Sequence, residues 1–133
     1  MEVSIQEKLL STLDESLRNS LINSQVSEAK GILKQQGKSI DDWKLVTFNL
    51  HDLIPTQQGD DYNNASSDED AKQYEKVKSG IYNIDEIRLK SFRPICVEFG
   101  TLKIIDGNHR HSAITKCGEK LIYAMLCIIK SLE

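Results

Sequence analysis

The chain has few of the features that mark membrane, secreted or zinc-binding proteins. No stretch reaches the roughly 18 consecutive apolar residues that a membrane-spanning helix needs. Its three cysteines are an odd number without a close pair, which predicts neither a disulfide framework nor a zinc site. The N-terminal residues also lack the basic-then-apolar pattern of a secretory signal. We therefore expect a cytoplasmic protein that does not associate with a membrane.

The chain also lacks a large excess of charge of either sign, but its first and second halves differ in charge. The net charge is −3 in 133 residues. Residues 1–70 carry 6 basic and 13 acidic side chains, whereas residues 71–120 carry 10 basic and 6 acidic ones. Because phosphate contacts dominate nucleic-acid binding, the acidic total does not favour nucleic acid, which stays open as a partner. The basic second half suits a small phosphorylated ligand better.

Two amphipathic helices are predicted in the N-terminal part. Ser4-Ile5-Gln6-Glu7 has the pattern of a capping box, and it begins a helix that is predicted to end at about Ser24. A second helix is predicted from about Val26 to Gln36, closed by Gly37. We expect this helical hairpin, residues 1–40, to cover one face of the domain that follows. The alternative is an arm for a protein partner or a homodimer, because the apolar stripe of the first helix is broad: Ile5, Leu9, Leu10, Leu13, Leu17 and Leu21.

Residues 41–133 are predicted to form an α+β domain. Residues 56–70 contain almost nothing to bury and predict a long polar loop, whereas residues 81–91 fit no single element well. Helices are predicted over 68–78, with Ala71, Tyr74 and Val77 on the inner face, and over 109–116. Strands are predicted over 43–50, 94–99, 102–105 and 121–129, the middle two as a hairpin.

One stretch combines the end of a strand, a glycine turn and the start of a helix. The apolar residues 102–105 lead into Asp106 and Gly107, and glycine permits a tight turn and the close approach of a ligand. The N–H groups at a helix N-terminus attract anions. The basic side chains of His109 and Arg110 lie near the positive end of the helix dipole. They lower the stability of the helix there unless a phosphate or carboxylate binds beside them. The stretch predicts an anion site, the alternative being a plain turn in which Asp106 only caps the helix.

The same stretch resembles the signature of the ParB/sulfiredoxin fold. Gly107, Arg110 and Ala113 match the Gly-x-x-Arg-x-x-Ala spacing of ParB-type nucleotide-binding domains, and the similarity covers roughly residues 44–129. It implies a mixed sheet with packed helices and a site that holds a nucleotide, CTP, ATP or ADP, with Mg²⁺. No protein side chain is assigned to the metal. The residues assigned to the phosphorylated ligand are Gly107, Asn108, Arg110, His111 and Ser112.

Three activities follow from this resemblance, and a fourth possibility is a protein-interaction module without catalysis. The first is a nucleotide-binding switch, without the helix-turn-helix region of ParB because few residues follow the last predicted strand. The second is a small-molecule phosphotransferase similar to the free-serine kinases, in which Asp106 acts on a hydroxyl and His109 polarises a phosphate oxygen. The third is a ParB-like nuclease, for which Asp106 and Glu98 are the carboxylates expected nearby. Whether the protein is an enzyme stays open.

Several positions differ from the family pattern or allow a second interpretation. The kinases carry a catalytic Glu where this chain has residues 55–58, Pro-Thr-Gln-Gln, so Asp60 or Asp61 would have to replace it. Sulfiredoxin has its nucleophilic Cys where this chain has Asn108, so its chemistry is not expected. His111 is assigned to the ligand by the motif but otherwise expected at the surface. Arg93 either reaches the site or pairs with a surface acid, and we expect the pairing.

Overall fold

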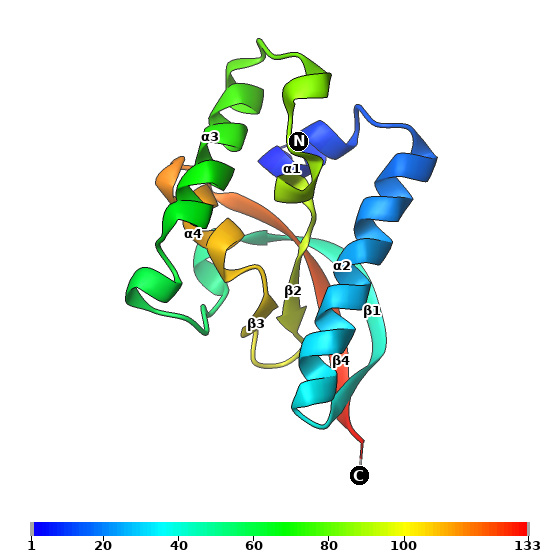
Figure 1. The fold of residues 1–133 in the computed structure, drawn as a ribbon. Helices are drawn as coiled ribbons and strands as arrows, with labels where there is room; N and C mark the ends of the chain where they lie inside the picture. Colours follow the sequence, from blue (N-terminus) through cyan, green and yellow to red (C-terminus); the bar gives the residue numbers. More distant parts are fainter. Residues whose placement is uncertain (1, 133) are drawn as a thin grey trace.

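The computed structural model describes residues 2–132, which form an α+β fold with a four-stranded mixed sheet (Figure 1). The predicted α+β class and the mixed sheet with packed helices are therefore confirmed. The α-helices are α1 (Ile5–Leu10), α2 (Glu15–Gln35), α3 (Ala65–Ser79) and α4 (Asn108–Lys116). The strands are β1 (Lys38–Asn49), β2 (Ile95–Glu98), β3 (Ile104–Asp106) and β4 (Leu121–Ser131). Short 3-10 helices span Leu50–Asp52, Gly59–Asp61, Ile84–Glu86 and Leu89–Phe92.

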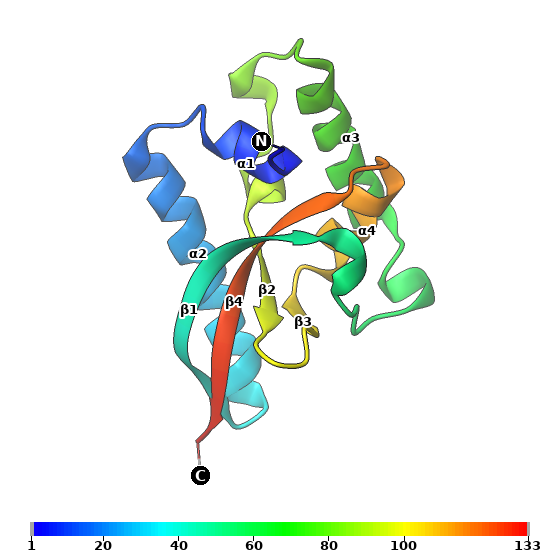
Figure 2. The same ribbon diagram turned by 180° about the vertical axis from the view of Figure 1, so that it is seen from behind.

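The sheet has the strand order β1-β4-β2-β3. β1 runs antiparallel to β4 over its whole length, and the predicted hairpin pairs β2 with β3. β2 and β4 are parallel, so α4 returns the chain from β3 to the centre of the sheet. Seen from behind, the paired strands β1 and β4 lie in front of α2 (Figure 2).

Alternate residues of the central strands face two separate cores. On β4, Ile122 and Ala124 join the core built with α1, α3 and α4, whereas Met125 and Cys127 join the core under α2. This alternation follows from the two-residue period of a strand whose two faces are both covered. The sheet is therefore enclosed by helices on both faces, and the helices of the N-terminal part contribute to both cores.

The N-terminal helices are divided at a different place from the prediction. The break lies between α1 and α2, where Asp14 caps α2 by accepting a hydrogen bond from the Leu17 N–H (2.8 Å), and no break occurs near Ser24. An Asp N-cap stabilises a new helix start, whereas the segment around Ser24 contains no helix-breaking residue. α1 places Ile5 in the core opposite to α2. The expected hairpin over one face is therefore wrong.

The other elements differ from the prediction mainly at their ends. α3 starts at Ala65 because Asn64 caps it through hydrogen bonds from the N–H groups of Ser66 and Ser67, so the polar loop is shorter than expected. Its predicted inner face is confirmed, with Tyr74 and Val77 fully buried. Within residues 2–132, no helix combines the length and apolar character needed to cross a membrane.

Candidate functional site

Gly107 forms the turn between β3 and α4 in a conformation that side chains disfavour. Its φ is +111°, and a Cβ atom at this position would lie 2.3 Å from Cγ2 of Ile95. Only glycine fits here without moving β2. Gly107 is also the N-cap of α4, and no side chain caps this helix. The alternative in which Asp106 merely caps the helix is therefore wrong, and the N–H groups of the first turn have no intrahelical acceptor.

A cavity of about 630 Å³ opens beside this turn. Its wall includes parts of helix α2, the segment that follows β1, helix α3, and the turn between β3 and α4. Its charged residues are three carboxylates, Glu28, Asp70 and Asp106, and two guanidinium groups, Arg93 and Arg110. The cavity also contains Gly107, Asn108 and His109 of the predicted motif. The motif and the N-terminal helix α2 thus meet at one cavity, in which positive and negative charges nearly balance.

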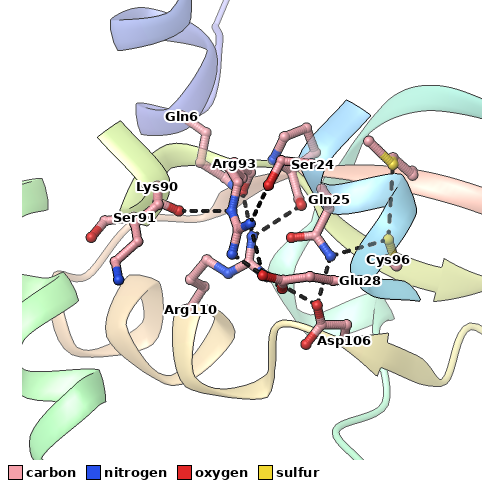
Figure 3. Close-up of polar contacts among 12 residues, drawn as sticks. Gln6, Ser24, Gln25, Glu28, Lys90, Ser91, Arg93, Cys96, Asp106 and Arg110 are labelled. Atoms are coloured by element: carbon pink, nitrogen blue, oxygen red, sulfur yellow. Dashed lines mark hydrogen bonds and ion pairs between the residues drawn. The ribbon is translucent and has the colours of Figure 1, made fainter. Parts of the chain in front are cut away.

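The Arg110 side chain contacts the backbone just before β2 and the carboxylate of Asp106 (Figure 3). Its Nη1 donates to the backbone oxygens of Arg93 (3.0 Å) and Pro94 (3.1 Å), and its Nη2 lies 3.7 Å from Oδ2 of Asp106. The side chain is only 8 % exposed. The positive charge that opposes the α4 dipole is therefore compensated within the fold. The positive charge of Arg110 is therefore not by itself evidence that an anionic ligand binds here.

Asp106 is held by α2 as well as by Arg110. Nε2 of the buried Gln25 donates a hydrogen bond of 2.6 Å to Oδ2 of Asp106 and also contacts Sγ of Cys96 at 3.5 Å. This arrangement fixes the carboxylate at the end of β3, beside the first turn of α4 (Figure 3). Asp106 is half-buried and lines the cavity, as a catalytic or ligand-binding carboxylate requires.

Asn108 and His109 fasten loops to the start of α4. The Asn108 side chain accepts a hydrogen bond from the Thr56 N–H (2.9 Å) and donates one to Oγ1 of Thr56 (3.0 Å). His109 Nε2 lies 2.8 Å from the backbone oxygen of Asp61 and 3.1 Å from Nδ2 of Asn64. Both residues line the cavity, but their side chains also hold the wall in place.

His111 and Ser112 are buried and do not line this cavity. Nδ1 of His111 lies 2.6 Å from the Tyr62 hydroxyl, and Nε2 lies 3.1 Å from the backbone oxygen of Leu50. Burial lowers the pKa of His111, an effect that the Leu50 oxygen partly opposes and the nearby His51 reinforces. The expected surface position of His111 is therefore wrong, and the structure does not bring these two motif residues to the other five.

Arg93 pairs with an acid, as expected, and it also lines the cavity, so the two alternatives given for it both occur. Its Nη1 and Nη2 donate to Oε1 (3.1 Å) and Oε2 (3.2 Å) of Glu28 on α2. This two-point contact between guanidinium and carboxylate is the same geometry that Arg uses to bind phosphate.

The acids expected to assist catalysis lie elsewhere. The side chains of Asp60 and Asp61 are exposed and do not line the cavity, and Glu98 lines a different cavity together with Lys103. Among the described residues, no three His, Cys, Asp or Glu side chains come together as metal ligands.

Sequence reasoning missed the contributions of Glu28, Gln25 and Asp70. Asp70 carries a usable signal, because it lies four residues before Tyr74 and seven before Val77, on the inner face of α3. Glu28 and Gln25 carry no comparable local signal, since their partners are 65 and 81 residues away in the sequence.

In comparisons with protein-family models, with curated proteins and with solved structures, the chain has no match.

Proposed function

We propose that this chain is a ParB/sulfiredoxin-type domain that binds a nucleotide or another phosphorylated small ligand in the cavity beside Gly107. The observation that carries the proposal is the position of the uncapped N-terminus of α4, which lines a cavity of about 630 Å³ together with two arginines. Backbone N–H groups and guanidinium groups are the usual partners of phosphate oxygens. The motif resemblance supports the same ligand class.

The backbone, rather than the motif side chains, supplies the first contacts in this proposal. Gly107 brings the chain close enough for the N–H groups of Asn108 and His109 to face a phosphate. The Asn108 and Arg110 side chains hold the surrounding wall. Arg93 contributes the charge that a phosphate pairs with. Mg²⁺ would arrive with the nucleotide, bound mainly by phosphate oxygens and water.

Phosphotransfer is a second candidate, favoured by one observation. Asp106 and His109 both line the cavity, so a carboxylate and an imidazole lie beside the proposed phosphate position. Phosphoryl transfer requires mainly positioning and charge stabilisation. Analysis of products after incubation with nucleotide and candidate acceptors distinguishes this enzyme from a binding switch.

Calorimetry with CTP, ATP, ADP and GTP in the presence of Mg²⁺, and with pyrophosphate, tests the proposal. We expect the wild type to bind at least one of them, and Arg93→Gln to weaken binding about ten-fold through loss of charged hydrogen bonds. Arg18→Gln removes the same charge from α2 outside the cavity and serves as the control. Arg110 is unsuitable for this test, because its side chain also holds the backbone at Arg93 and Pro94, so its loss would disturb the fold as well as the charge of the cavity. Absence of binding by all four nucleotides and by pyrophosphate would overturn the proposal.

A further inference from the structure

Side chains of α2 hold most of the Arg93 guanidinium. Nη1 donates to Oγ of Ser24 (3.0 Å) and to Glu28, and Nη2 donates to Glu28 (Figure 3). Nε donates to the backbone oxygen of Lys90 (3.2 Å). The Arg93 side chain is 12 % exposed, whereas that of Glu28 is 51 % exposed. The cation is therefore fixed at the cavity wall, and its carboxylate partner lies at the solvent boundary.

The two arginines of the cavity differ in what an incoming anion can displace. The Nη1 of Arg110 is bound to two backbone oxygens, which cannot turn away without moving β2. The Arg93 partner that accepts two hydrogen bonds is a side chain, and it can rotate into solvent from the outer surface of α2. An incoming phosphate would keep the largely buried Arg93 cation paired, and the half-exposed carboxylate of Glu28 would be solvated by water.

We propose that Glu28 occupies the position on Arg93 that the phosphate of the ligand takes, so that α2 carries an internal competitor of the ligand. This inference rests on the proposed function. A phosphate presents two oxygens to the same guanidinium fork that Glu28 now engages. The exchange therefore preserves both hydrogen bonds and transfers the carboxylate to water. Glu28 sets the affinity of the cavity for anions, and α2 supplies this control.

Glu28→Gln provides the direct test, with pyrophosphate and CTP–Mg²⁺ as calorimetric probes. The variant removes the competing charge and its repulsion of the ligand, and we expect binding to tighten about five-fold. Glu15→Gln neutralises one carboxylate of the same helix outside the cavity and should leave the affinity unchanged. Arg93→Gln introduced together with Glu28→Gln should abolish the gain, because the shared cation is then absent.

The outcomes separate this inference from the function on which it rests. Equal affinities of wild type and Glu28→Gln would overturn the inference and leave the binding function standing. An equal gain in Glu15→Gln would show a general charge effect and would also overturn it. Failure of every variant to bind either probe would overturn both proposals. Binding by Glu28→Gln that exceeds wild type and disappears in the double variant supports both.

Discussion

Gly107 adopts a backbone conformation, and lies against a neighbour, that only glycine tolerates. We expect Gly107→Ala to destabilise the protein by about 2–5 kcal/mol, because the new Cβ meets Ile95 and the positive φ is strained. Gly31→Ala in α2 is the control, since no atom lies within 4 Å of its Cβ position; it should gain about 0.5–1 kcal/mol through helix propensity. Urea unfolding measures both changes. A Gly107 variant as stable as the wild type would contradict this account of the turn.

His111 makes stability depend on pH. Burial lowers its pKa in the folded state, so the unfolded chain binds the proton more readily. The free energy of unfolding is therefore unaffected by this group above the pKa of histidine in the unfolded chain, about 6.5. It decreases as the pH falls below that value, by at most about 1.4 kcal/mol per pH unit. Urea unfolding of wild type and His111→Gln between about pH 7.5 and 5.5 isolates this contribution, which the variant should lack. Parallel pH curves for the two proteins would show that His111 is not responsible.

At the scale of elements, α1 is hydrogen-bonded to strand β4 through the side chain of Gln6. Gln6 is fully buried, its Oε1 accepts a hydrogen bond from the Tyr123 N–H (2.6 Å), and its Nε2 donates to the Tyr123 oxygen (3.1 Å). Gln6→Met keeps the volume but leaves the β4 groups unpaired, and we expect a loss of about 1–3 kcal/mol. Lys8→Met on the exposed face of the same helix should change stability by less than about 0.5 kcal/mol. Equal unfolding midpoints for both variants would mean that α1 contributes only apolar packing.

Elements governed by local chemistry could be predicted from the sequence, and those governed by distant contacts could not. The β2–β3 hairpin, the inner face of α3 and the glycine turn follow from periodicity and turn residues. The break before Asp14 was missed because the leucine spacing continues across it. The start of α3 depends on Asn64, a cap that lies within a polar segment with no apolar period.

At the scale of the whole molecule, the position of the site could be predicted from the sequence, but the residues that surround it could not. Five of the seven motif residues line the cavity, because the turn itself places them there. The charge of Arg110 suggested a missing anion, yet backbone oxygens and Asp106 compensate it. The contacts that define the cavity's electrostatics join α2 to residues more than 60 positions away. Long-range pairs of this kind leave no local pattern in a single sequence.

The most direct test of phosphate binding at the α4 N-terminus is a titration followed through backbone amide resonances. CTP, ATP, ADP and GTP with Mg²⁺, and pyrophosphate alone, would be added to the isotope-labelled wild type. We predict saturable shifts that are largest at the amides of Asn108, His109 and Arg110, because phosphate oxygens accept hydrogen bonds from the first turn. Saturable shifts confined to β1, at the far edge of the sheet, or no saturable shift with any ligand, would contradict the account.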